Sequence, residues 1–341
     1  MADDVELSLM TQSIVAQENT SASSRLMRKH TAFLVVAALF AAFTFSIQPL
    51  AQADIFGSET NTFDISFVNI GDVGNAADTT GYGAVPYAYR IGLNEVSGND
   101  ILKATASGMS NVEAGSGNRP AAGISWLETA AFANWLNTST GKQAAYDLTW
   151  DGAAWSMNLW SSADAWQLGG ENLYRHKDAY YFLPSENEWY KAAYFNSLVS
   201  SYFEYATGSD TAPTPVTGGI TSDTAVYGQP GREGPLPAEV FNAGGLSTYG
   251  TMAQGGNVTE LLESAFDGVN DSVFDLRATR GGDVSDGFGP LTSGNRAANT
   301  PTHEHHYIGF RVASVPEPST YALIFMAGAG WLLWSRWKHS L

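Results

Sequence analysis

The sequence predicts an α+β fold built from short elements and many irregular connections. Glycine accounts for 35 of the 341 residues, a share typical of a chain with many turns. Hydrophobic residues make up 44% and aromatic residues 12%, which is enough to build a sizeable core. Few segments have the length of a helix, and no repeat of about 20–50 residues is evident. We therefore expect a single domain between Asp54 and about Arg311.

The first half of this body predicts two strands and one helix. Residues 63–68 alternate between apolar and polar side chains, as a half-buried strand does. Residues 87–91 are a second candidate strand. Residues 128–137 consist mostly of good helix formers, and Ser125 is placed to cap their N-terminus.

The second half predicts a helix, a long loop and a closing strand. Residues 185–194 follow a proline, and Ser185 and Glu188 have the spacing of a capping box. Residues 207–237 are rich in Thr, Gly and Pro and show no periodicity, so we expect a long loop. Residues 309–312 are expected to form the closing strand, with Arg311 paired to a buried carboxylate.

Charge and cysteine content exclude several classes of function. The formal net charge is −17 and the isoelectric point is near 4.6. Such an acidic chain does not follow a phosphate backbone by charge, so nucleic acid is not an expected partner. The chain has no cysteine, which excludes disulfides, cysteine nucleophiles and thiolate metal sites.

The N-terminal residues 1–53 have the pattern of an export signal. Basic residues at 25–30 precede the uncharged residues 31–47, and Ala51 and Ala53 then form a small-x-small cleavage pattern. We expect cleavage after Ala53. The alternative is a membrane anchor that is not cleaved.

The C-terminal residues 314–341 contain a second pattern in three parts. Pro316, Glu317 and Pro318 precede the uncharged residues 321–334, and a basic end follows. The alternative, an amphipathic helix packed on the domain, is weak because the apolar stretch has no polar face. This tail resembles the PEP-CTERM sorting signal of Gram-negative bacteria. The resemblance implies an exosortase-type membrane protease as partner, transient anchoring of the C-terminal helix in the inner membrane, and release to the cell surface or extracellular matrix.

Four motifs in the body carry a second resemblance. They are an I-S-W segment at 124–126, an F-L-P-S-E-N-E-W segment at 182–189, a G-G-N-V-T-E segment at 255–260, and R-G-G at 280–282 with G-F-R at 309–311. In this order they resemble the sulfatase-modifying-factor, or formylglycine-generating-enzyme, domain over roughly residues 60–313. The resemblance implies a C-type-lectin-like α+β fold for residues 54–313, with little regular secondary structure.

The resemblance also identifies chemistry that this chain lacks. The family oxidises a substrate cysteine with two cysteines of its own, located between the R-G-G and G-F-R motifs. Residues 283–308 occupy that interval and contain no cysteine. A serine or threonine does not replace them, because a hydroxyl is far less acidic than a thiol and does not hold cuprous copper. We therefore expect no formylglycine-generating activity.

Two metal sites are candidates. The resemblance implies a calcium site formed by Gly256, Val258 and Glu260, in which carbonyl oxygens and a carboxylate suit a hard cation. Ala253 stands where the family supplies a further oxygen ligand, so the site is expected to be weakened.

The second candidate is the His303-Glu304-His305-His306 segment. On a strand His303 and His305 share a face and could hold zinc or copper. The alternative is a solvated polar loop before the final strand.

These observations predict an exported, non-catalytic protein of the cell surface or extracellular matrix. Its loops would bind a ligand such as an exopolysaccharide or a surface protein. The aromatic residues between 150 and 181 could stack on sugars, although most are expected in the core. One alternative is a divergent metal-dependent enzyme that uses His303, Glu304 and His305. Another is a purely structural matrix component.

Overall fold

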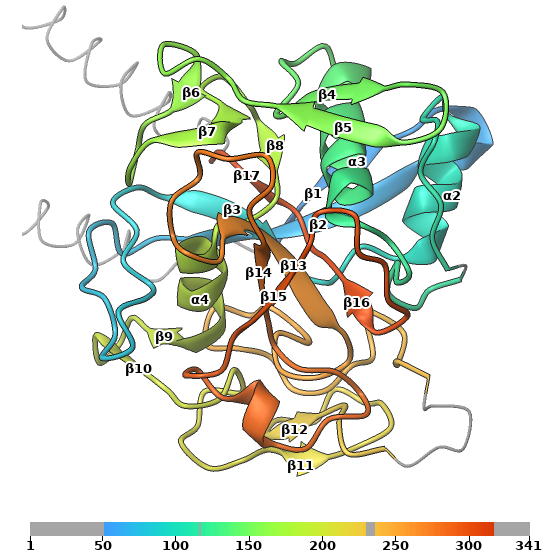
Figure 1. Ribbon diagram of the computed structural model, residues 1–341. Coiled ribbons are helices and arrows are strands. Elements are labelled where there is room, and N and C mark those ends of the chain that lie inside the picture. Colours follow the sequence, from blue (N-terminus) through green and yellow to red (C-terminus); the bar gives the residue numbers. More distant parts are fainter. Residues whose placement is uncertain (1–50, 116, 230–235, 317–341) are drawn as a thin grey trace, which may run out of the picture. The chain divides into compact units, whose positions relative to one another are not determined.

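A five-stranded sheet, a four-stranded sheet and three short helices form most of the described part of the chain, as the computed structural model shows (Figure 1). The structure describes residues 51–115, 117–229 and 236–316. These residues belong to one compact unit. The predicted signal segment before residue 51, and the sorting-motif residues Glu317 and Pro318 with the tail after them, lie outside the described residues.

The larger sheet has five strands, and every neighbouring pair is antiparallel. In spatial order they are β1 (Gln52–Phe56), β2 (Phe63–Ile70), β3 (Tyr89–Gly92), β17 (Ala313–Ser314) and β8 (Tyr181–Phe182). β2 and β3 confirm the two predicted strands with slightly shifted bounds. β1 begins two residues before the predicted start of the domain and pairs with β2 along its whole length.

The smaller sheet has four strands and lies at the centre of Figure 1. In spatial order they are β15 (Ala297–Asn299), β14 (Arg277–Arg280), β13 (Thr259–Ala265) and β16 (Ile308–Gly309). β13 pairs with β16 in parallel and with β14 in antiparallel orientation. Most side chains of β13 and all of those of β14 are buried, as expected for a sheet covered on both faces.

The predicted closing strand is divided between the two sheets. Gly309 pairs with Glu260 in the smaller sheet, whereas Ala313 pairs with Ile91 and Phe182 in the larger one. The three residues between them cross from one sheet to the other. The prediction of one continuous strand over 309–312 was wrong, because the chain leaves the smaller sheet after Gly309 and joins the larger sheet only at Ala313.

Three α-helices lie in the described residues, and each starts with a capping box. They are α2 (Gly98–Ala106), α3 (Trp126–Ser139) and α4 (Glu186–Tyr194), capped by Ser97, Ser125 and Ser185. In each case the serine side chain accepts from the third backbone N–H, and the acid at that position accepts from the serine backbone. α3 and α4 confirm the two predicted helices. α2 was not predicted, although Ser97 and Asp100 carry the same signal.

Short elements complete the connections. The described residues include two 3-10 helices, η1 (Glu59–Asn61) and η2 (Gly289–Leu291). Four two-stranded sheets are formed by β4 (Asp147–Trp150) with β5 (Trp155–Asn158), β6 (Ala165–Trp166) with β7 (Asn172–His176), β9 (Phe195–Asn196) with β10 (Ser201–Tyr202), and β11 (Thr214–Pro215) with β12 (Thr224–Ala225). The predicted long loop at 207–237 thus contains a small parallel pair, β11 and β12. Residues 230–235 lie outside the described residues.

The largest apolar core joins the five-stranded sheet to α2 and α3. Phe67, Ile91, Phe132 and Phe310 are all fully buried in it. Phe132 and Phe310 meet edge to face with ring centroids 5.6 Å apart, a favoured aromatic geometry. The residues that close the chain therefore pack directly against α3.

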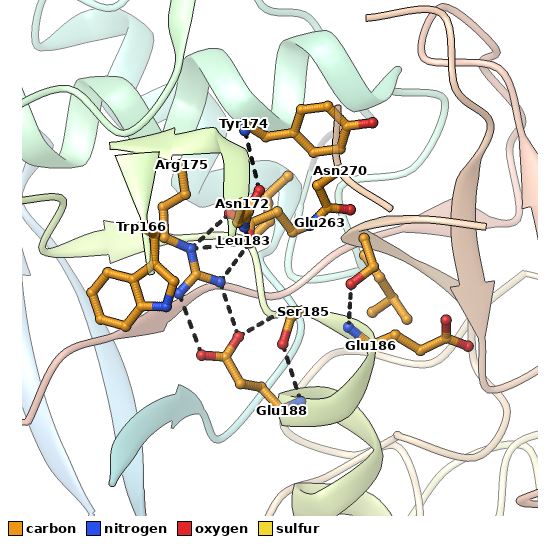
Figure 2. A network of polar contacts seen from close by, with 12 residues as sticks. Trp166, Asn172, Tyr174, Arg175, Leu183, Ser185, Glu186, Glu188, Glu263 and Asn270 are labelled. Atoms are coloured by element: carbon orange, nitrogen blue, oxygen red, sulfur yellow. Dashed lines mark hydrogen bonds and ion pairs between the residues drawn. The ribbon is translucent and has the colours of Figure 1, made fainter. Parts of the chain in front are cut away.

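A buried network of charges connects β7, α4 and β13, as Figure 2 shows. The Arg175 guanidinium donates to both oxygens of Glu263, with Nε–O distances of 2.9 and 3.0 Å. It also reaches Glu188 of α4, with an Nη2–Oε2 distance of 3.1 Å. Its planar group lies 3.6 Å over the ring of Phe182. Burial disfavours the charge, but Glu188 and Glu263 outweigh it and hold the Arg175 pKa well above its ordinary value.

Neutral partners complete this network. Asn172 and Tyr146 donate to Glu263 at 2.5 and 2.8 Å, and Tyr87 donates to Glu188 at 2.9 Å. Buried charges with this many partners are expected to position three elements relative to one another. The network is closed to solvent, so we assign it to the framework and not to a binding site.

No helix in residues 51–115, 117–229 or 236–316 combines the length and apolar character needed to cross a membrane.

Candidate functional site

A cleft of about 600 Å³ opens where the N-terminus of α3 approaches the β4–β5 hairpin. Trp150 and Trp155 contribute its aromatic side chains, and Glu113, Glu128 and Glu304 contribute its carboxylates. The loop before α3, the first turn of α3, the hairpin and the loop before β16 supply these residues from distant parts of the sequence. In size the cleft falls within the range of ordinary small-molecule sites.

The hairpin fixes the two tryptophans beside each other. Trp150 and Trp155 are directly paired across β4 and β5, and their ring centroids lie 5.4 Å apart with an interplanar angle of 58°. The Asp151 carboxylate in the turn accepts from the backbone N–H groups of Ala153 and Ala154, both at 2.8 Å. These two bonds lower the Asp151 pKa and keep the turn closed. The rings are therefore presented by a braced turn.

One tryptophan is also anchored to the opposite wall. Trp155 Nε1 donates to the backbone oxygen of Asn111 at 2.7 Å, which satisfies its only polar group. Both tryptophans are only partly buried, so ring surface remains open toward the cleft. This arrangement provides aromatic faces whose positions do not depend on a ligand.

The carboxylates of the cleft have different environments. Glu128 is held by the α3 capping box, where Oε2 accepts from the Ser125 backbone N–H at 2.8 Å and from its hydroxyl at 2.6 Å. Glu113 and Glu304 are exposed. No lysine or arginine lines the cleft among the described residues. Three acids thus share a cleft that contains no basic side chain.

The structure places the predicted calcium residues in the interior, at the start of β13. Gly256 has φ 93°, and a Cβ there would lie 2.4 Å from the backbone oxygen of Val226, so only glycine fits. Val258 and Glu260 are fully buried. The Glu260 carboxylate accepts from Arg311 Nε and Nη2, both at 2.6 Å, which confirms the predicted pairing of Arg311.

These residues do not fit calcium as they stand. The second Glu260 partner is Trp189 Nε1 at 2.8 Å, so both carboxylate oxygens already accept from donors on neighbouring side chains. Within the part of the chain that the structure describes, no group of three or more His, Asp or Glu side chains could hold a metal ion. Calcium at Gly256, Val258 and Glu260 stays a prediction, and binding through that carboxylate would require Arg311 to leave it.

Residues 303–306 form an exposed loop and not a strand, as the alternative prediction had it. The rings of His303 and His305 are nearly parallel with centroids 6.2 Å apart, and His305 and His306 lie 4.3 Å apart. Partial burial, followed by the charges of His306 and His303, lowers the His305 pKa. A metal at His303 and His305 stays a prediction.

Part of the cleft could have been found from the sequence. Trp150 and Trp155 flank Asp151 and Gly152, a dipeptide typical of tight turns between strands. Glu128 follows from the predicted helix and its capping serine. Glu113 and Glu304 gave no local signal, because only the folded chain brings them to the hairpin. Pro316 of the predicted sorting motif is exposed, at the end of the described residues.

A comparison with protein families identifies the family of this domain. Residues 57–315 match the family model described as "Sulfatase-modifying factor enzyme 1-like domain". No curated protein matches the chain.

Several solved structures are similar. Treponema denticola variable protein 1 matches with a TM-score of 0.53 and 20% identity, covering 79% of this chain and 100% of that one. CarF matches with a TM-score of 0.49 and 20% identity, over 80% and 100% of the two chains. PvdO from Pseudomonas aeruginosa matches with 0.46 and 15%, over 79% and 100%. The first of these supports the predicted α+β, C-type-lectin-like fold.

Proposed function

We propose, from the premise that this chain belongs to the sulfatase-modifying factor enzyme 1-like family, that its domain is a non-catalytic module that binds glycan in the Trp150–Trp155 cleft. The family's cysteine chemistry has no thiol to work with here, because the sequence contains no cysteine. The fold remains, and with it a framework that can carry a binding site on its loops.

The paired tryptophans are the observation that carries this proposal. Sugar rings present flat faces of C–H groups, and a fixed aromatic ring binds such a face at little entropic cost. The hydrogen bond from Trp155 to Asn111 and the Asp151 turn provide that rigidity. Carboxylates beside the rings can accept hydrogen bonds from sugar hydroxyls.

The proposal places this activity outside the cytoplasm. The basic, apolar and small-residue segments of residues 1–53 support export, and Pro316-Glu317-Pro318 with the apolar tail supports sorting by an exosortase-type protease. An exopolysaccharide of the cell surface or matrix is then the natural ligand. Detection of the mature chain on intact cells, with its termini read by mass spectrometry, tests this part separately.

Retention of the purified protein on immobilised polysaccharides, together with a glycan array, tests the binding function. We expect retention by the native chain and its loss in Trp150→Ala, which removes one ring and keeps the Trp155 anchor. Phe274→Ala is the matched control, because Phe274 is 89% exposed and does not line the cleft. Equal retention of the native chain and Trp150→Ala, or no retention by any glycan, would contradict the proposal.

A further inference from the structure

The charge of the cleft narrows the class of ligand beyond glycan in general. Resting on the proposed function, we infer that this cleft selects an amino-sugar polymer that carries free, protonated amines. The inference combines three observations: the acids of the cleft, the orientation of its aromatic pair and the charge of the whole chain.

The first observation is that the carboxylates of the cleft lack cationic partners. Glu113 and Glu304 form no ion pair within the described residues, and Glu128 is engaged only with the backbone and hydroxyl of Ser125 and the N–H of Glu113. A uronic acid or a sulfated sugar would bring a further negative charge among three carboxylates, which is unfavourable. A protonated amine supplies the missing counter-charge and donates hydrogen bonds.

The second observation is that the tryptophan rings offer faces to a cation. The two rings lie 5.4 Å apart with an interplanar angle of 58°, and both partly exposed side chains line the cleft. The face of tryptophan attracts an ammonium group more strongly than other aromatic side chains do. An amino-sugar ring can therefore stack on an exposed tryptophan face while its amine pairs with a carboxylate of the same cleft.

The third observation concerns association. A net charge of −17 produces a negative potential around the chain, which concentrates polycations and repels polyanions. A polymer with an amine on many of its sugars gains from this field at every repeat, whereas a neutral polymer does not. The long-range field and the local cleft favour the same ligand.

Calorimetry with three oligosaccharides of equal length tests the inference on the folded protein at slightly acidic pH. The probes are a fully deacetylated β-1,4-glucosamine hexamer, its fully N-acetylated counterpart and a galacturonic acid hexamer. We expect the deacetylated hexamer to bind roughly tenfold or more tightly than the acetylated one. We expect no binding of the galacturonic acid hexamer, and we expect added salt to weaken only the deacetylated complex.

Two variants separate charge from stacking. Glu113→Gln with Glu304→Gln keeps the shape of the cleft and should reduce the preference for the deacetylated hexamer severalfold, while Glu128 and the tryptophans remain. Trp150→Ala should weaken both glucosamine hexamers. Glu171→Gln with Glu239→Gln is the charge-matched control, because both residues are exposed and neither lines the cleft, and it should behave as the native chain.

The outcomes distinguish this inference from the proposed function. Equal or tighter binding of the acetylated hexamer overturns the inference and leaves glycan binding standing. No binding of any hexamer, with no retention on polysaccharides, overturns both. Complete displacement of the deacetylated hexamer by an equal concentration of spermidine also overturns it, since the site would then recognise an amine without its sugar.

Discussion

The buried network around Arg175 and the open cleft around Trp150 differ in how the charge of their glutamate side chains is balanced. In the network, Glu188 and Glu263 both contact one guanidinium that is almost completely buried. In the cleft, Glu113 and Glu304 face solvent, and none of the described lining residues is a lysine or arginine. The interior thus balances its negative charge within the protein, whereas the cleft leaves that charge for something else to balance.

The difference indicates where this chain keeps its framework and where it has room for a ligand. Four buried glutamates, at positions 186, 188, 260 and 263, contact arginine. Glu95 is the contrasting case, because burial and the nearby Glu260 raise its pKa well above the ordinary value. A buried carboxylate without a neighbouring cation tends to bind a proton, because burying an unpaired charge is costly. An exposed carboxylate does not pay this cost. Solvent hydrates the exposed carboxylates of Glu113 and Glu304, so they need no cation from the protein.

Removal of the central cation of the network should have the largest effect. In Arg175→Leu, Glu188 and Glu263 remain buried beside each other without their guanidinium. We expect a loss of about 3–5 kcal/mol in the free energy of unfolding, measured by urea denaturation.

The matched control lies two residues further along the chain. Lys177 pairs with Asp164 at 3.2 Å, with both side chains about half exposed. Lys177→Leu should change stability by less than about 1 kcal/mol, as exposed ion pairs usually do. Similar losses in the two variants would show that the buried network is no more important to the framework than a surface pair.

Lys191 sharpens the comparison with a buried amine that is held by backbone oxygens. Its ammonium donates to the carbonyls of Gly71 and Asp72, at 2.6 and 2.9 Å. Burial lowers the Lys191 pKa to about 8, although the charge of Asp72 opposes this. Between that value and the ordinary 10.5, the unfolded chain binds a proton that the folded chain does not. Stability from this group therefore rises with pH across that window.

Urea denaturation from about pH 7.5 to about pH 8.5 measures the start of this rise, where tyrosines of the unfolded chain are still almost fully protonated. Lys191→Met should flatten the slope of stability against pH, whatever its effect on stability at a single pH. An unchanged slope in the variant would mean that another group causes the pH dependence.

Calcium removal should have the smallest effect. Since Arg311 and Trp189 already occupy both Glu260 oxygens, we expect equal melting temperatures in millimolar calcium and in excess chelator. A saturable rise of the melting temperature with calcium would revive the site at Gly256, Val258 and Glu260.

Local signals account for much of what the sequence could predict of the fold. The capping boxes at Ser125 and Ser185 located α3 and α4, and alternation located β2 and β3. β1 was missed because Gln52 and Ala53 also fit the end of an export segment. The closing strand was predicted as one piece, since alternation carries no information about which sheet each residue joins.

The site was less predictable for a related reason. The pairing of Arg311 with a buried acid followed from an arginine in an apolar strand, but its partner Glu260 had been interpreted as a calcium ligand. The acid that pairs with Arg311 and the predicted calcium ligand are the same carboxylate, that of Glu260. Only the folded structure shows that an arginine lies beside it. Glu113 and Glu304 are 191 positions apart in the chain, so no spacing rule could join them.

Arg90 has a consequence for how this protein can be trimmed. It donates to the Asp54 carboxylate in β1 at 2.6 and 3.1 Å and to the Ser314 hydroxyl in β17 at 2.8 Å. One side chain thereby connects β1 and β17, which are the first and last strands of the larger sheet in chain order. Cleavage after Ala53 and just before Pro318 would preserve the contacts of Arg90 with Asp54 and Ser314. A fragment cut to the family boundaries, 57–315, would lose Asp54 and with it the ion pair that connects Arg90 to β1.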